Sequence, residues 1–154
     1  EAAKKKGVLP ITDKKMTRFN ITLEESVEMV KNFLSISKGG EMFVPKIPSY
    51  SLIDLAEAIG PSCKKEIIGL RPGEKIDEEM ITISDSHRTF DIGKYYLILP
   101  TEKDISYKKY AQYKNHKKIE ENFSYNSGNN SKFLSVNELR ELIKINIDKN
   151  FKPI

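Results

Sequence analysis

Arg71 and Glu74 flank a proline–glycine pair, and their side chains could bind a phosphate and a sugar. A guanidinium offers a planar fork of donors that suits phosphate oxygens, and a glutamate carboxylate can accept two hydroxyl protons. Pro72 fixes one backbone angle and Gly73 permits a positive φ, so the pair predicts a tight turn that holds Arg71 and Glu74 in a fixed relation. A surface turn that happens to carry charges is the alternative interpretation, since Pro-Gly turns are common.

The elements around this turn would place it at the edge of a sheet. The apolar run at 66–70 predicts a buried strand, and residues 76–81 could carry a short helix. The turn would then lie just beyond the carboxyl end of a strand, where open α/β sheets bind their ligands. Upstream, a strand candidate at 41–44 and a helix that begins near Ser51 precede the turn. Together, residues 42–70 suggest two parallel strands joined by a right-handed crossover.

Two further helices are indicated by capping signals. Thr22 and Glu25 have the spacing of a capping box, and so do Ser135 and Glu138. The first helix should be amphipathic over about four turns and end at Gly39–Gly40. Its predicted apolar face comprises Leu23, Val27, Val30 and Leu34. We also expect residues 1–6 to be the last turns of a helix closed by Gly7.

Length, charge and cysteine content limit the class of protein. The 154 residues suit one domain, and the net charge of +4 is compatible with a polyanionic ligand without indicating nucleic acid. Cys63 is the only cysteine in the sequence, so no internal disulfide is possible and a reducing, cytoplasmic location is expected. No apolar run approaches the ~18 residues that span a bilayer, so we expect no membrane partner.

Residues 100–130 differ in composition from the rest of the chain, with tyrosines interleaved among lysines. Such a stretch could bind nucleic acid through phosphates and stacked bases. Acidic residues interrupt the run, so we favour a solvated loop whose rings pack on the domain, and we expect no nucleic-acid partner. The stretch should be a long irregular excursion. His87 and His116 lack partners with metal-ligand spacing, and we expect both at the surface and no metal site.

Several stretches together resemble one family. They are 10–13 (PITD), 16–24 (MTRFNITLE), 39–49 (GGEMFVPKIPS), 67–75 (IIGLRPGEK) and 123–130 (FSYNSGNN). In this order they are similar to the second half of inverting UDP-N-acetylglucosamine 4,6-dehydratases, which belong to the extended short-chain dehydrogenase/reductase superfamily. Those enzymes act in the synthesis of bacterial nonulosonic acids, such as pseudaminic acid, and of surface polysaccharides. The blocks at 43–49 and 71–75 are specific to this group.

The resemblance implies an α/β fold: the C-terminal, substrate-binding lobe of an extended Rossmann-type enzyme, with a small mixed or parallel sheet and flanking helices. Residues 1–100 would form the nucleotide-sugar-binding lobe, and 101–154 an irregular extension ending in a terminal helix. Arg71 resembles the arginine that grips the UDP diphosphate, and Glu74 the acid that holds the ribose hydroxyls. Thr12 lies in the segment bordering the uridine. Arg18 matches a second arginine near the phosphates, with a salt bridge to a neighbouring acid as the alternative.

The resemblance also implies what lies outside this chain. The family's other half carries the Rossmann sheet, the NADP loop and the catalytic Asp, Lys and Tyr, so no catalytic residue is assigned here and NADP is not expected to bind this chain alone. We expect a fragment, a truncated reading frame or one subunit of a split enzyme. Its partners would be a UDP-sugar, an N-terminal Rossmann half if encoded separately, and further copies in a homo-oligomer. A UDP-sugar epimerase of the same superfamily and an inactive interaction module remain alternatives.

Overall fold

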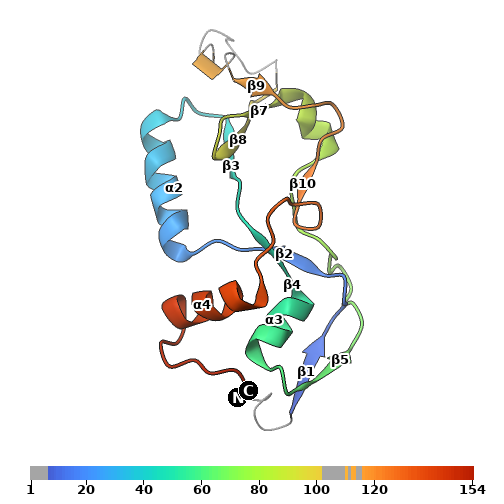
Figure 1. Cartoon of the computed structure of the whole chain (residues 1–154). Coiled ribbons are helices and arrows are strands. Elements are labelled where there is room, and N and C mark those ends of the chain that lie inside the picture. Colours follow the sequence, from blue (N-terminus) through green and yellow to red (C-terminus); the bar gives the residue numbers. More distant parts are fainter. Residues whose placement is uncertain (1–6, 102–109, 111, 114–115) are drawn as a thin grey trace. The chain divides into compact units, whose positions relative to one another are not determined.

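The computed structural model describes residues 7–101, 110, 112–113 and 116–154, which form two compact units (Figure 1). Unit 1 comprises the chain up to Asn20 with Pro48–Glu78 and Ser127–Ile154. Unit 2 comprises Ile21–Ile47 and Glu79–Asn126. The predicted boundary at residue 100 falls inside unit 2, and the division into a binding lobe and an extension remains a prediction about function. The expected helix at 1–6 lies outside the described residues.

Unit 1 contains two small sheets. The strands of the first run parallel and those of the second antiparallel. They are β1 (Val8–Ile11) with β5 (Lys64–Ile67), and β2 (Thr17–Phe19) with β4 (Ser49–Ser51). Because β1 and β5 are parallel and in register, with Ile11 opposite Ile67, their carboxyl ends meet at one edge.

Two helices pack against each other in unit 1: α3 (Leu52–Ile59) and α4 (Val136–Asn146). Ala58, Leu134 and Leu139 form the buried core between them. Arg140 on α4 donates to the carbonyl oxygens of Ala58 (3.3 Å) and Glu57 (3.2 Å), near the carboxyl end of α3. These carbonyls lack helical partners and carry the negative end of the helix dipole, so a cation is favourable there.

Unit 2 is built on a four-stranded antiparallel sheet in the order β3-β8-β7-β9. Its strands are β3 (Met42–Pro45), β7 (Thr89–Asp91), β8 (Tyr95–Ile98) and β9 (Lys117–Lys118). The core on this sheet contains Leu97, Leu99, Tyr110 and Tyr113. Unit 2 also contains a two-stranded antiparallel sheet of β6 (Glu79–Ile81) and β10 (Tyr125–Asn126), and a 3-10 helix, η1 (Ile83–Arg88), follows β6 along the chain.

The helix α2 (Leu23–Ile36) belongs to unit 2, and its predicted capping box between Thr22 and Glu25 is present. The face that packs on the sheet is not the predicted one. The Phe33 ring stacks on Phe43 of β3 at 3.8 Å between centroids and meets Tyr95 of β8 edge-on at 4.7 Å. The predicted stripe is instead exposed, by 75% at Leu23, 44% at Val27, 53% at Val30 and 77% at Leu34. The prediction was wrong because it relied on the spacing of aliphatic residues. The aromatic contacts of Phe33 instead determine which face of α2 packs on the sheet.

The mixed α/β class with small sheets and flanking helices is confirmed, but three local predictions are wrong. The expected buried strand at 66–70 ends at Ile67, and its apolar side chains are about half exposed. The expected parallel pair across 42–70 does not form, because β3 pairs antiparallel with β8 while β5 pairs with β1. The possible helix at 76–81 is replaced by strand β6, which has β10 as a partner.

The prediction for residues 100–130 is partly confirmed. Tyr110 and Tyr113 are buried, with 2% and 6% of their surface exposed, so these rings do pack on the domain. The later part is not a loose excursion, because Tyr125 and Ser127 are also buried and β10 pairs with β6. His87 and His116 are exposed as predicted. None of the helices in the described residues is both long and apolar enough to cross a membrane.

Candidate ligand-binding site

The turn at 71–74 has the predicted geometry. The Glu74 amide donates to the Arg71 carbonyl at 3.0 Å, and Gly73 has a φ of +80°. Proline before a glycine of positive φ is the pattern of a type II turn. The Glu74 carboxylate also accepts the Arg71 amide at 3.1 Å. The turn therefore fixes the backbone of Arg71 relative to the carboxylate of Glu74.

The two side chains of this turn keep binding capacity. Arg71 is exposed, and its guanidinium forms no ion pair within the part of the chain that the structure describes. Glu74 is half-buried and uses one carboxylate oxygen on the Arg71 amide, so its second oxygen can accept further hydrogen bonds. The turn can thus offer a fork of donors to an anion and an acceptor to hydroxyl groups.

Thr12 lies at the same edge of the parallel sheet from which the chain runs to the turn. Thr12 follows β1 directly, and the chain leading to the turn follows β5. The Ile68 amide donates to the Ile11 carbonyl at 2.9 Å, which extends the pairing past the end of β5. The predicted position of the turn, beyond the carboxyl end of a strand, is therefore confirmed.

Arg18 is engaged by protein groups. Its terminal nitrogens donate to the carbonyls of Thr17 (2.6 Å), Ile76 (2.9 Å) and Lys75 (3.1 Å), and one also approaches the Met16 sulfur at 3.0 Å. Its Nε lies 3.8 Å from the Glu78 carboxylate. The salt bridge that the sequence left as the alternative is thus present, and the arginine is tied to the segment that follows the turn.

Tyr50 lies opposite Arg18 in the β2–β4 ladder. Burial raises the pKa of its phenol, the Glu78 carboxylate raises it further, and the Arg18 guanidinium acts in the opposite direction. The phenol therefore stays protonated and neutral across the physiological pH range.

Sequence reasoning missed a buried polar cluster beside the turn. The Thr17 hydroxyl donates to the Asp77 carboxylate at 2.7 Å and lies 2.6 Å from the Ser127 hydroxyl. The Glu78 amide donates to the same serine oxygen at 2.9 Å. These residues are far apart in the sequence, and no motif at any of them indicates the contact.

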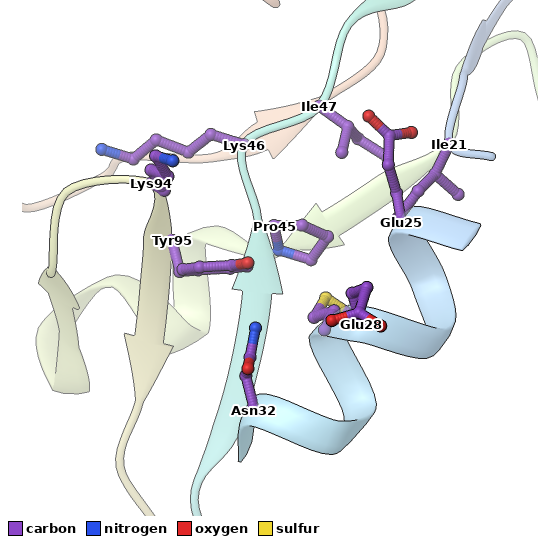
Figure 2. A pocket seen from close by; sticks show the side chains of 10 residues that line it. Ile21, Glu25, Glu28, Asn32, Pro45, Lys46, Ile47, Lys94 and Tyr95 are labelled. Atoms are coloured by element: carbon purple, nitrogen blue, oxygen red, sulfur yellow. The ribbon is translucent and has the colours of Figure 1, made fainter. Parts of the chain in front are cut away.

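Unit 2 contains a separate open pocket of about 320 Å³ between α2 and the strands β3 and β8 (Figure 2). Glu25 and Glu28 line one side, and Lys46 and Lys94 the other. Two of these groups already have local roles, since Glu25 caps its own helix and Lys46 pairs with Asp91 at 2.5 Å. None of the predicted site residues lines this pocket, since all four belong to unit 1.

Comparison with known proteins agrees with this architecture. Residues 1–100 match the family model described as polysaccharide biosynthesis protein, and the chain belongs to that family. A UDP-N-acetylglucosamine 4,6-dehydratase (inverting) of Campylobacter jejuni subsp. jejuni serotype O:2 is 44% identical over 139 residues, covering 88% of this chain and 42% of the relative. A UDP-glucose 4-epimerase of Rickettsia felis is 34% identical, covering 91% of this chain and 41% of the relative.

A solved structure is similar over nearly the whole chain. The X-ray structure of Pen from Bacillus thuringiensis superposes with a TM-score of 0.72 at 32% sequence identity. The superposition covers 92% of this chain and 41% of that protein. The chain thus spans about two fifths of the length of the proteins it matches, and it corresponds to the C-terminal part of the Campylobacter dehydratase.

Proposed function

We propose that this chain is the UDP-sugar-binding part of an inverting UDP-N-acetylglucosamine 4,6-dehydratase of surface polysaccharide synthesis. The observation that carries the proposal is the turn of Arg71 and Glu74 at the carboxyl edge of the β1–β5 sheet. Arg71 would bind the diphosphate and Glu74 the ribose hydroxyls. Thr12 at the same edge would border the uridine, and Arg18 would be a second cation toward the phosphates. The identity to the Campylobacter dehydratase supports the substrate class.

NADP is the cofactor that the resemblance implies, and the described residues do not fit it. Dinucleotide phosphates bind where a glycine-rich turn opens a helix after a parallel strand. In the described sheet, β1 is followed by Thr12–Asp13 and β5 by the 68–74 segment, and neither opens a helix. No hydride-transfer step is therefore derived from this chain. Cofactor binding and the lyase chemistry would belong to a Rossmann half, and the enzyme would work in the cytoplasm, as the single Cys63 suggests.

Calorimetric titration with UDP and with uridine tests the site. Arg71→Ala should weaken UDP binding about 10- to 150-fold, the equivalent of the roughly 1.5–3 kcal/mol of a charged hydrogen-bond pair, and leave uridine unaffected. Glu74→Gln should weaken both ligands, because both carry the ribose. Lys75→Ala is the matched control, since it removes a neighbouring exposed cation. Binding heat that survives Arg71→Ala and Glu74→Gln unchanged, or no UDP binding by the unaltered chain, would overturn the proposed site.

The same titration separates the dehydratase from the epimerase. The similarity to the Rickettsia felis UDP-glucose 4-epimerase supports the alternative that this chain belongs to a UDP-glucose epimerase. We expect UDP-N-acetylglucosamine to bind at least tenfold more tightly than UDP-glucose. The opposite order would favour the epimerase.

A second candidate is an interaction module, which the exposed stripe on α2 favours. Leu23, Val27, Val30 and Leu34 form one continuous apolar line of the kind that marks protein contacts. Light scattering with and without UDP discriminates the two functions. Self-association that Val27→Lys with Val30→Glu abolishes, in a chain that does not bind UDP, would support the module alone.

A further inference from the structure

The turn that carries Arg71 and Glu74 has few restraints of its own. Among the described residues, and apart from the two chain neighbours of each glycine, no heavy atom lies within 4 Å of the position that a Cβ would take at Gly69 or Gly73. Both glycines have positive φ, and the apolar side chains of Ile68 and Leu70 are about half exposed. The orientation of the turn must therefore come from the two stems that join it to unit 1.

The first stem is the parallel sheet, and the second is the segment 75–78. The Ile76 carbonyl accepts the Thr17 amide at 3.0 Å and an Arg18 donor at 2.9 Å. The Glu78 carboxylate accepts the Phe19 amide at 2.8 Å. This segment thus lies along β2 and fixes the chain one residue after Glu74.

The side chains of Thr17, Asp77 and Ser127 form a chain of hydrogen bonds that holds this second stem. Every bond in the chain donates in the same direction. Thr17 has a single hydroxyl proton and gives it to the Asp77 carboxylate, so Ser127 must donate to Thr17. The Ser127 oxygen in turn accepts the Glu78 amide. The chain of donors starts at Glu78 and ends at its neighbour Asp77, which makes each bond dependent on the others.

The cluster is closely packed. Ser127 is completely buried and Thr17 is 8% exposed. A methyl group at Gly128 would lie 2.7 Å from the Asp77 carboxylate, closer than atoms of neighbouring residues come. The Asp77 side chain is therefore held by the hydrogen bond from Thr17 and by close packing against the backbone of Gly128.

We infer that Thr17, Asp77 and Ser127 are positioning residues, which set the orientation of the 71–74 turn for ligand binding. The inference rests on the proposed function for the role of the turn as a nucleotide-sugar site. The positioning itself is a property of the chain without ligand. Two consequences of the positioning can be measured separately: the rigidity of the turn and the affinity of the site for its ligand.

The experiment compares Thr17→Val, which removes the hydroxyl at constant shape, with Thr17→Ser, which keeps it. Amide hydrogen exchange should rise at least tenfold at Glu74 and its neighbours in Thr17→Val, and stay near the original rate in Thr17→Ser. The affinity for both UDP and uridine should fall, by about fivefold or more for UDP and by a smaller factor for uridine, because the displaced turn carries both Arg71 and Glu74 and uridine would contact Glu74 alone. Asp77→Ala should repeat both effects at a partly exposed position, should Thr17→Val fail to fold.

Ser135→Ala is the matched control, since it weakens a helix cap of unit 1 without touching the turn. Faster exchange that spreads equally over α3 and α4, or a turn unchanged in Thr17→Val and Asp77→Ala, would overturn the inference. So would an affinity loss confined to UDP, which would mark a phosphate contact instead. If the unaltered chain binds neither ligand, the proposed function fails, and the exchange comparison still decides the positioning role.

Discussion

Replacing Arg18 by methionine should destabilise unit 1 even in the absence of any ligand. Methionine keeps most of the apolar stem but removes the guanidinium, which serves the carbonyls of Thr17, Lys75 and Ile76. A charged hydrogen bond contributes about 1.5–3 kcal/mol. The arginine side chain is 21% exposed and the Ile76 carbonyl keeps the Thr17 amide, so we take about 1 kcal/mol for each bond. The expected loss is about 3 kcal/mol, a large part of the ~5–15 kcal/mol by which domains are stable.

Urea unfolding followed by circular dichroism and by tyrosine fluorescence measures this loss. A chain of two units can unfold in more than one transition. The transition of unit 1 is recognised as the one that Leu139→Ala also shifts, because Leu139 lies in the α3–α4 core. Lys144→Met on α4 is the control in unit 1, since the side chains of the Lys144–Glu141 pair are 43% and 61% exposed and the pair contributes less than ~0.5 kcal/mol.

If Arg18→Met lowers the free energy of unfolding of unit 1 by less than ~0.5 kcal/mol, no more than the control does, the reasoning is refuted. Such a result would mean that water serves the carbonyls of Lys75 and Ile76 equally well and that the hydrogen bonds of Arg18 add no stability to unit 1.

Three further predictions concern local stability. Ser135→Ala should lower the free energy of unfolding of unit 1 by about 1 kcal/mol, because the cap of α4 loses its hydroxyl acceptor, and urea titration measures it. Leu139→Ala should cost about 2–5 kcal/mol in the same assay, since the side chain is 4% exposed and leaves a cavity. The Thr82 hydroxyl and the Arg88 guanidinium lower the pKa of Asp85. Stability from this carboxylate is therefore complete above its ordinary pKa of about 4 and is lost as the pH falls through the lowered value. Melting temperatures between pH 2 and 6 should show this loss, and Asp85→Asn should make the profile flatter.

Features set by neighbouring residues could be predicted from the sequence. The capping boxes at Thr22 and Ser135 formed as predicted, because a cap needs only a hydroxyl and an acid three residues later. The turn at Arg71–Glu74 formed because proline fixes φ at its second position and glycine permits the positive φ that its third position requires. The pair at the centre of the candidate site was therefore within reach of sequence reasoning.

Features set by distant residues were not within reach. Thr17 meets Asp77 across 60 positions and Ser127 across 110, and hydroxyl and carboxylate groups occur too often for a pattern to select these three. The same limit explains the strand pairing, where β5 takes β1 as its partner and not the expected β3. On α2, the contact of Phe33 with Phe43 depends on a strand that the helix's own periodicity does not describe.

The path of the chain makes unit 2 a pair of insertions into unit 1. The first insertion leaves after Asn20 and returns at Pro48, and the Asn20 amide donates to the Pro48 carbonyl at 2.8 Å. The second leaves after Glu78 and returns at Ser127, whose amide donates to the Glu78 carbonyl at 2.8 Å. Each excursion thus begins and ends at adjoining backbone groups. Both could be excised and replaced by short glycine bridges, leaving a miniature protein that retains every proposed ligand contact.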